Sequence, residues 1–480
     1  RLDDLAALGV TAIELMPVAD FPGSRDWGYD GVALFAPDAA YGRPEDLKAL
    51  IDAAHARRLM VFLDVVYNHF GPEGNYLGAY ARRFFDAHRH TPWGAAIAFA
   101  EEPVVRRFFI DNALYWLEEF RIDGLRLDAV HAIDDPSSPD IIEEIAAAVR
   151  EWQPADRRVH LVLENDDNAA RYLRRDDRGR PQRYVAQWND DIHHALHVLL
   201  TGEGRGYYAD YAGAPVRHLG RCLAEGFAWQ GEPSPYRDGA VRGEPSAQLP
   251  PTAFVSFLQN HDQIGNRAFG ERLAALASLE AVRAGLAVLL LAPSPPLLFM
   301  GEEWGSRRPF LFFCDLGEEL RAAVREGRRR EFARFPEFAD PGVRARIPDP
   351  TSADSFVRSK LDWAEAAAPP HAATLAWTRR LLALRHRQII PRLPGTPGGR
   401  GRVLATSGRA LSVCWTLGDG SRLTLRANLD DKAIAAASLP RPPGRRLIMT
   451  PAADDGDNAP ALTAWSVAWF LDETVLEVRP

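Results

Sequence analysis

The feature that most restricts the fold of this sequence is an alternation of short apolar runs with amphipathic stretches through its first three quarters. The apolar runs are rich in β-branched residues, and the stretches between them, such as residues 45–58 and 104–120, have helical periodicity. This alternation is typical of parallel βα units, so we predict an α/β fold. Seven runs are predicted as buried strands: residues 11–18, 59–66, 122–130, 159–165, 187–190, 254–261 and 295–303.

A closed (β/α)₈ barrel, the TIM barrel, needs one strand more than these runs supply. The chain opens with RLDDLAALGV, which resembles the middle of a helix, so we expect a truncated N-terminus with the first strand upstream of Arg1. We therefore predict that residues 1–389 form the catalytic barrel. Residues 70–103, rich in aromatic residues, Gly and Pro, are predicted to form a short excursion from it.

The pattern changes after the helical stretch at residues 374–389. PRLPGTPGGRG is a linker-like break, and short alternating segments follow it, which is typical of antiparallel strands. We predict a C-terminal antiparallel β-sandwich over residues 390–480. Its expected strands include residues 409–417, 422–429, 445–450, 464–471 and 474–480.

Two further segments carry no predicted chemistry. Residues 231–252 have turn residues and charges without periodicity, which predicts a surface loop. Residues 324–335 form a basic helical run, which predicts a solvated helix face.

Charge and cysteine content exclude several classes of function. The net charge is -8, with 57 Lys and Arg against 65 Asp and Glu, so we expect no binding to nucleic acid or anionic lipid. No apolar stretch is long enough for a membrane span. The 3 Cys lie far apart, which suits neither a disulfide framework nor a zinc site and favours a cytoplasmic protein. Oligomeric state has no signal in the sequence.

Polar side chains follow five of the predicted strands, at the barrel rim where TIM-barrel chemistry occurs. Any one such group could be a helix cap or a turn, but five strands share the feature. The groups are Asp64 to His69, Arg126 with Asp128, Glu164, Asp190 with Asp191, and His261 with Asp262.

Two of these groups meet the needs of glycoside hydrolysis, which requires a pair of carboxyl groups across the scissile bond. Asp128 lies two residues after Arg126 on the same strand face, so a cation would keep this carboxylate ionised. Glu164 ends an apolar strand, where partial burial would raise its pKa and retain a proton. Asp262 could hold the reacting sugar ring. The alternatives are a structural ion pair for Asp128 with Arg126, a helix cap for Glu164 and a turn for His261 with Asp262.

Four segments resemble, in order, the motif regions of the α-amylase superfamily of glycoside hydrolases: DVVYNH (64–69), GLRLDAVHA (124–132), VLEN (162–165) and FLQNHD (257–262). The resemblance implies a retaining hydrolase with Asp128 as nucleophile, Glu164 as general acid/base and Asp262 as transition-state stabiliser. It implies no catalytic metal and no cofactor, and a supporting role for Asp64. Expected substrate contacts are Tyr29, His69, Arg126, His131, Asp190, Asp191, His193, His261, Gln263 and Asn266, although several of these could instead hold the barrel rim together.

The segments WGYDGVALFAP, QWNDDIHHALHVLLTGE, FLQNHDQIGNR and FMGEEWGS resemble the malto-oligosyltrehalose trehalohydrolase family within that superfamily. This resemblance implies hydrolysis of the α-1,4 bond next to the terminal trehalose of malto-oligosyltrehalose, which releases trehalose and a malto-oligosaccharide. Asn165 departs from the small residue that usually follows the acid. The alternatives are a glycogen branching or debranching enzyme and a catalytically silent carbohydrate-binding relative.

Overall fold

The computed structural model describes residues 1–91, 93–333, 335–451 and 460–474. Its central element is a curved parallel sheet in the order β1-β4-β7-β8-β9-β12-β13. Each strand overlaps one of the predicted runs, which confirms the α/β barrel architecture. The strands are β1 (Ala12–Leu15), β4 (Met60–Val65), β7 (Gly124–Leu127), β8 (His160–Leu163), β9 (Ala186–Trp188), β12 (Phe254–Phe257) and β13 (Pro296–Leu297).

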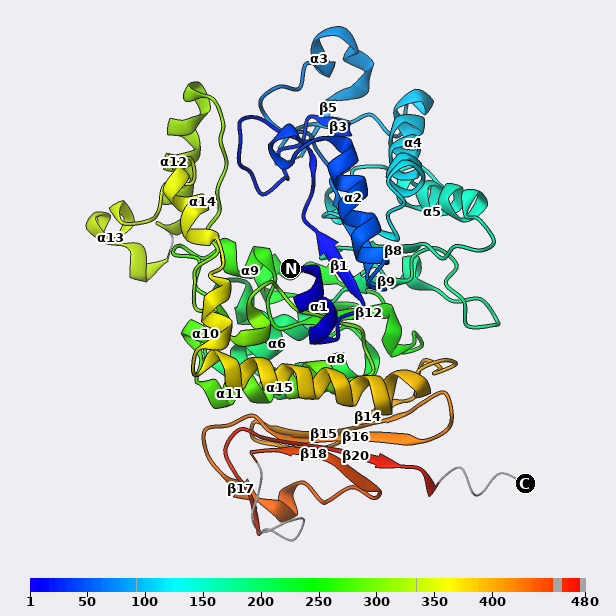
Figure 1. Ribbon diagram of the computed structural model, residues 1–480, viewed down its shortest axis with the longest axis vertical. Helices are drawn as coiled ribbons and strands as arrows, with labels where there is room; N and C mark the ends of the chain where they lie inside the picture. Colours follow the sequence, from blue (N-terminus) through cyan, green and yellow to red (C-terminus); the bar gives the residue numbers. More distant parts are fainter. Residues whose placement is uncertain (92, 334, 452–459, 475–480) are drawn as a thin grey trace.

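Helices such as α2, α4 and α5 cover the outer face of this sheet, and α4 and α5 each bury an apolar stripe in the core (Figure 1). In α5, for example, Ile141, Ile145 and Val149 recur at helical spacing and are all buried. The helices predicted at residues 45–58 and 104–120 are confirmed as α2 and α4. The principal helices are α2 (Pro44–His55), α4 (Pro103–Glu119), α5 (Ile141–Trp152), α6 (Asp190–Thr201), α8 (Pro215–Glu225), α11 (Leu279–Leu291), α12 (Glu318–Phe332) and α15 (His371–Leu384).

The parallel sheet is open within the described part of the chain, since β1 and β13 end its strand order and do not pair with each other. Helix α1 (Leu2–Leu8) precedes β1. The excursion after β4 contains helix α3 (Leu77–Tyr80) and the hairpin β5 (Phe85–Thr91) with β6 (Gly94–Ile97). None of the described helices has both the length and the apolar character needed to cross a bilayer.

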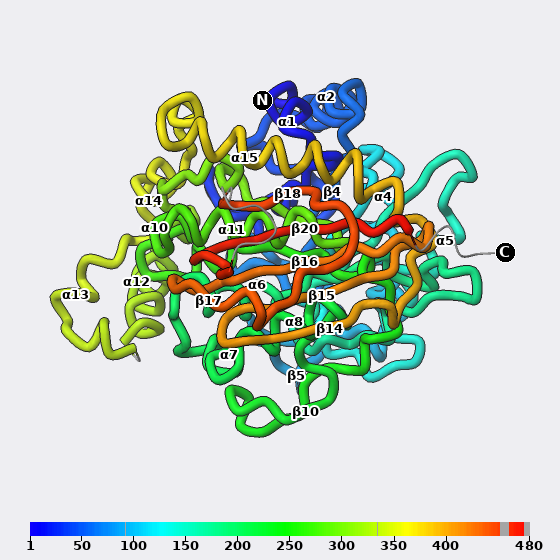
Figure 2. Tube along the Cα trace, turned by 90° about the horizontal axis from the view of Figure 1, so that it is seen from below, coloured from blue at the N-terminus to red at the C-terminus, as the bar shows by residue number. Residues whose placement is uncertain are grey.

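An antiparallel sheet closes the chain, in the order β14-β15-β16-β20-β18 (Figure 2). This confirms the strands predicted at residues 409–417, 422–429, 445–450 and 464–471, while residues 475–480 of the last predicted segment lie outside the described residues. Its second layer among the described residues is the short ladder of β17 (Ile434–Ala435) with β19 (Ala461–Leu462). The strands are β14 (Gly401–Ser407), β15 (Ala410–Thr416), β16 (Arg422–Asn428), β18 (Arg445–Thr450) and β20 (Ser466–Asp472).

The C-terminal sheet packs directly on the barrel helices, and one hydrophobic core runs through both. Trp415 donates its indole N–H to the carbonyl of Leu223 in α8 at 2.8 Å. Trp469 donates in the same way to Ala287 in α11 at 2.9 Å. These two bonds satisfy the polar atoms of rings that are otherwise buried in apolar surroundings.

The surface loop predicted at residues 231–252 is confirmed for most of the segment, whose residues are largely exposed or half-buried and irregular. The segment contains a short hairpin, β10 (Glu232–Pro233) with β11 (Val241–Arg242), and Ser234, Arg242 and Ser246 are buried. An irregular segment can be buried when distant side chains satisfy its polar groups, and that pairing leaves no periodic signal in the sequence.

Candidate active site

Asp128 and Glu164 directly follow two neighbouring strands, β7 and β8, whose parallel register pairs Leu127 with Leu163. Hydrogen bonds continue the ladder beyond the strand ends, because Glu164 N donates to the Leu127 carbonyl at 3.0 Å and Val130 N to the Glu164 carbonyl at 3.0 Å. The two carboxyl groups therefore lie side by side at the carboxyl end of the sheet, where the sequence predicts the catalytic pair.

Arg126 lies beneath this pair with 0% of its surface exposed. Its Nη1 is 2.6 Å from Oδ2 of Asp64 and 2.9 Å from Oδ1 of Asp128, and its Nη2 is 2.7 Å from Oε2 of Glu164. Its guanidinium also stacks over the ring of Trp188, with Cζ 4.1 Å from the ring centroid. One buried cation therefore holds three carboxylates, and the predicted pairing of Arg126 with Asp128 is confirmed.

Burial raises the pKa of Asp128 to about 6, because the opposing attraction of Arg126 and the hydrogen bond from Asn68 Nδ2, at 2.8 Å, only partly offset it. Burial also raises the pKa of Glu164, and the charge of Asp128 adds to this while Arg126 opposes it. The site therefore shifts the pKa of Glu164 upward, which is the direction that a general acid requires.

Backbone strain lies between the two carboxyl groups. Ala129 has a φ of 38°, in the left-handed region that residues with a Cβ rarely adopt. In this conformation Ala129 N donates to Oε2 of Glu164 at 2.8 Å. The turn after Asp128 thus orients the carboxyl group of Glu164, a contact that the sequence pattern did not reveal.

The raised pKa of Asp128 predicts how kcat/KM falls at low pH, on the acidic limb of its pH profile. With Asp128 as the predicted nucleophile, which attacks only when it is ionised, kcat/KM should fall as the pH drops through about 6. Replacing Asn68 by Ala should move this limb to higher pH, because the variant loses a hydrogen bond that favours the carboxylate. A series of kcat/KM values from pH 4 to 9 on both proteins would measure this, and an unshifted limb in the variant would contradict it.

Asp262 reaches the site from α9 (His261–Gly265), whose N-cap Asn260 accepts a hydrogen bond from Asp262 N at 2.8 Å. Burial and the charge of Glu164 raise the pKa of Asp262 to about 7. The neighbouring His261 ring stacks on Tyr29 with centroids 5.1 Å apart. The three predicted catalytic carboxyl groups thus share one electrostatic environment.

Two aromatic contacts form walls around this site. The Tyr29 hydroxyl donates to Oδ2 of Asp64 at 2.6 Å, which fixes the ring beside the carboxylates. The His69 ring stacks on Trp93 of the excursion with centroids 4.6 Å apart, and burial lowers the pKa of His69 to about 4. Trp93 is 50% exposed, a position from which its ring can also stack on a sugar. Trp93 has no role predicted from the sequence.

Four other predicted contacts lie around the rim. Gln263 donates to Oδ1 of Asp190 at 3.3 Å, and the exposed Asn266 donates to Oδ1 of Asp262 at 3.4 Å. Burial and neighbouring carboxylates raise the pKa of Asp190. His131 is exposed and accepts a hydrogen bond through Nδ1. Substrate contact by these four residues stays a prediction.

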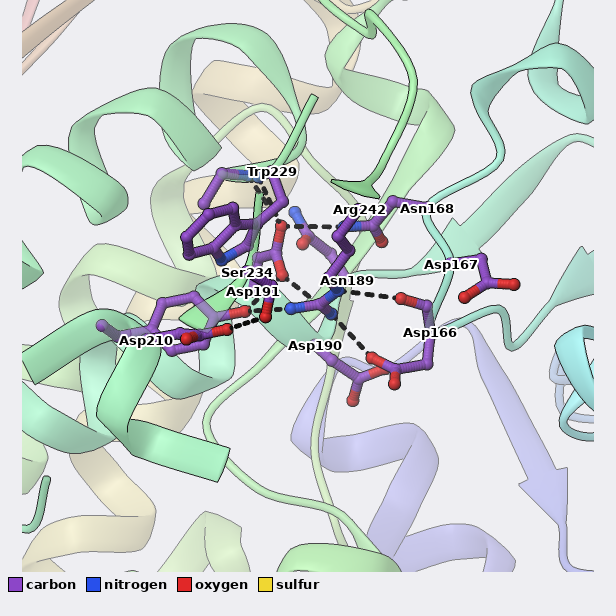
Figure 3. A network of polar contacts seen from close by, with 12 residues as sticks. Asp166, Asp167, Asn168, Asn189, Asp190, Asp191, Asp210, Trp229, Ser234 and Arg242 are labelled. Atoms are coloured by element: carbon purple, nitrogen blue, oxygen red, sulfur yellow. Dashed lines mark hydrogen bonds and ion pairs between the residues drawn. The ribbon is translucent and has the colours of Figure 1, made fainter. Parts of the chain in front are cut away.

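Asp191 and His193 are corrections to the predicted set (Figure 3 shows Asp191). Asp191 is 0% exposed, and its carboxylate is bonded to protein groups on every side. His193 is also buried, with its ring nitrogens 2.6 Å from the Leu258 carbonyl and 3.0 Å from the Tyr208 hydroxyl. Both residues hold the start of α6 in place and have no free polar atom for a sugar.

His193→Ala tests whether this residue has a structural role. Loss of two buried hydrogen bonds should lower the free energy of unfolding by about 1–3 kcal/mol. KM should not change, because the ring does not reach the site. Urea denaturation and steady-state kinetics of the same preparation would check both values, and a raised KM at unchanged stability would restore the original interpretation.

Fold and site together define the class: this chain is a glycoside hydrolase of the α-amylase type. Residues 1–90 match the family model described as "Alpha amylase, catalytic domain". Residues 398–469 match a second model, described as a domain of unknown function.

Curated relatives define the family more closely. The chain is 42% identical over 454 residues to the malto-oligosyltrehalose trehalohydrolase of Deinococcus radiodurans, an alignment that covers 94% of this chain and 72% of that protein. It is 44% identical over 391 residues to the enzyme of the same name from Arthrobacter ramosus, covering 80% of this chain and 66% of the relative. The chain belongs to the malto-oligosyltrehalose trehalohydrolase family.

Further similarities extend to other proteins of related sequence or fold. A crystal structure described as a putative α-amylase from Salmonella typhimurium has a TM-score of 0.93 and 47% identity, covering 98% of this chain and 78% of that one. A glucan branching enzyme from Mycobacterium bovis is 28% identical over 325 residues, covering 64% of this chain and 41% of the relative. Pullulanase from Paenibacillus barengoltzii, with a TM-score of 0.66 and 20% identity, shares the fold.

Proposed function

We propose that this chain hydrolyses the α-1,4-glucosidic bond next to the terminal trehalose of malto-oligosyltrehalose, releasing trehalose and a malto-oligosaccharide. Membership of the trehalohydrolase family supports the substrate. The observation that carries the reaction type is the buried guanidinium of Arg126, which contacts Asp128 and Glu164 at once and so holds an ionised and a protonatable carboxyl group in one site.

The proposed mechanism is a double displacement. Asp128 attacks the anomeric carbon while Glu164 donates its proton to the glycosidic oxygen, so the C–O bond breaks and trehalose leaves. Glu164, now ionised, takes a proton from water, and the resulting hydroxide equivalent hydrolyses the glycosyl–Asp128 ester. Two inversions retain the configuration. The reaction uses side chains and water, without a metal or cofactor in any step.

The proposed substrate contacts follow from the surroundings of the carboxyl groups. Tyr29, His69 and His261 form the wall of the reacting subsite, Arg126 holds the carboxylates beneath it, and Asp262 stabilises the charge that develops on the ring. Tyr29 and His261 stack on each other, which presents a rigid aromatic edge to the sugar. We infer that the rim residues Asp190, Gln263, Asn266 and His131 contact the leaving group.

We also infer where the two domains of the chain begin and end. Residues 1–389 would form the catalytic unit with its excursion at 70–103, and residues 390–480 the C-terminal β domain. The end of α15 and the short π-helical segment Arg385–Ile389 that follows it support a boundary there. Free thiols at Cys222, Cys314 and Cys414 support a cytoplasmic location. Membership of the trehalohydrolase family supports a role in trehalose formation from glucan.

Product analysis tests this function. The protein would be incubated separately with maltopentaosyl-trehalose and maltoheptaose, with the Asp128→Asn protein as control, and products followed by chromatography. We expect trehalose from the first substrate, little cleavage of the second and no product with the variant. Rapid cleavage of maltoheptaose, or branched products, would move the function to an amylase or a branching enzyme.

A further inference from the structure

A second buried arginine, Arg242, lies behind the turn that follows the acid, and only 4% of its surface is exposed. Its Nε donates to the backbone carbonyl of Asp166 at 2.9 Å, and its Nη2 donates to the carboxylate of the same residue at 2.7 Å. On its other side, Nη1 donates to the Tyr211 hydroxyl at 2.7 Å and Nη2 lies 3.1 Å from Oδ1 of Asp191. Figure 3 shows Arg242 between the two aspartates.

Asp191 provides a rigid anchor for this arginine. Its Oδ2 accepts hydrogen bonds from Asn168 Nδ2 at 3.0 Å and from the backbone N–H groups of Ala228 and Trp229 at 2.7 and 3.1 Å. Its Oδ1 accepts from the Tyr211 hydroxyl at 2.5 Å. A carboxylate with this many donors is held in one position, so Arg242 is held as well.

The turn at residues 165–168 is also bound by the hairpin that carries Arg242. Gly243 N donates to the Asp167 carbonyl at 3.2 Å, and Glu244 N donates to the Asn168 carbonyl at 3.1 Å. Arg237, at the tip of the hairpin, donates to the Asp167 carboxylate at 2.7 Å. The turn is therefore fixed by a segment distant in sequence as well as by its own hydrogen bonds.

The charges around Asp166 favour its ion pair with Arg242. Burial opposes ionisation of Asp166, but Arg242 and Arg237 outweigh it and hold the pKa of this carboxyl group below its usual value. Asp166 therefore stays ionised, and its ion pair with Arg242 persists, at the pH where Asp128 is ionised and able to attack.

Resting on the role of Glu164 proposed above, we propose that Arg242 is a positioning residue for this acid. The β ladder fixes the backbone on the strand side of Glu164, and Arg242 fixes the turn that begins directly after it. The donors of Arg242 point to protein acceptors in its buried position, so it acts through the turn and not on the sugar. A shift of the turn would displace the proton of Glu164 from the glycosidic oxygen.

A pair of substrates with different leaving groups separates this role from general stability. Fluoride leaves from α-maltotriosyl fluoride without protonation, whereas trehalose leaves from maltopentaosyl-trehalose only with a proton from the acid. In Arg242→Lys, which keeps the charge and loses the planar fork, kcat/KM for the trehalose substrate should fall about 10- to 100-fold, the effect of a misplaced catalytic group. The kcat/KM for the fluoride should change little. Azide should restore turnover, because it attacks the glycosyl–Asp128 ester in place of activated water.

Two further variants make the result decisive. Glu164→Gln should show the same leaving-group dependence and azide rescue, and if it does not, the proposed role of Glu164 fails. Arg221→Gln removes a different anchor of the hairpin, the 2.6 Å bond to Glu232, without touching residues 165–168, and should affect neither substrate selectively. Equal losses on both substrates in Arg242→Lys, or a selective loss in Arg221→Gln, would overturn the inference.

Arg237 holds the same turn and provides an alternative variant for this test. If Arg242→Lys does not fold, Arg237→Gln is measured in its place, because the Arg237 side chain is 24% exposed and its loss is better tolerated. A selective loss on the trehalose substrate supports the positioning of Glu164 by the hairpin. No loss, or an equal loss on both substrates, overturns it.

Discussion

Asp128→Asn should abolish turnover of maltopentaosyl-trehalose, with kcat reduced on the order of 10⁴-fold or more, as in other hydrolases that lose a covalent nucleophile. An amide cannot form the glycosyl ester, and no other described carboxylate is held by both Arg126 and Asn68. Steady-state assays at several enzyme concentrations would measure the residual rate.

The fold should survive this substitution, which keeps the shape of the side chain. The folded state raises the pKa of Asp128 to about 6, above its ordinary value of 3.8, so ionisation of this group opposes folding as the pH rises through that interval. The variant lacks this cost and should gain stability relative to the wild type between pH 5 and 8. Thermal melts at several pH values would show it. A variant that melts below the wild type throughout would assign the lost activity to misfolding.

Arg126→Met should cause the largest loss of stability in the barrel, about 3–5 kcal/mol, because it leaves buried carboxylates without their cation. Burial already raises the pKa of Asp64 and of Asp128 to about 6. Below that pH both groups become protonated and need the arginine less, so the loss should be largest above pH 6 and smaller at pH 5. Urea denaturation at pH 5 and pH 8 measures the difference.

Arg385 provides the matched control for this prediction. It is also buried, but its guanidinium binds only backbone carbonyls, including those of Leu290 at 3.2 Å and Ser294 at 2.9 Å. Arg385→Met should therefore lose stability by a similar amount at both pH values. If the loss in Arg126→Met is equally independent of pH, the carboxylates are not what the arginine stabilises.

The strands and the central carboxyl groups could be predicted from the sequence because each strand is a local apolar run and its polar end marks the barrel rim. The same signal failed at Asp191 and His193, since a polar residue after a strand can face the site or the interior. The partners that decide this lie far along the chain, such as Tyr211 and Arg242 for Asp191. Burial by distant partners has no periodicity, and for the same reason the buried residues within the surface loop at 231–252, Ser234, Arg242 and Ser246, could not be predicted.

The stacking of Trp93 on His69 was not predicted from the sequence, for a related reason. One tryptophan in an irregular segment carries no directional signal, and only the fold of the excursion brings its ring onto His69. Asn165, noted as a departure in the sequence, accepts a hydrogen bond from Asp167 N at 3.1 Å through its side chain. It therefore shapes the turn after the acid.

The two indole bonds between the C-terminal sheet and the barrel helices affect how the molecule unfolds. Trp415 and Trp469 belong to the sheet, yet their acceptors lie in α8 and α11, so neither part can separate without exposing two large rings and two unpaired carbonyls. We therefore expect the sheet and the barrel to lose their structure in one cooperative step. A scanning calorimeter should record a single heat-absorption peak for the whole chain, and proteolysis near residue 390 should release no stable fragment.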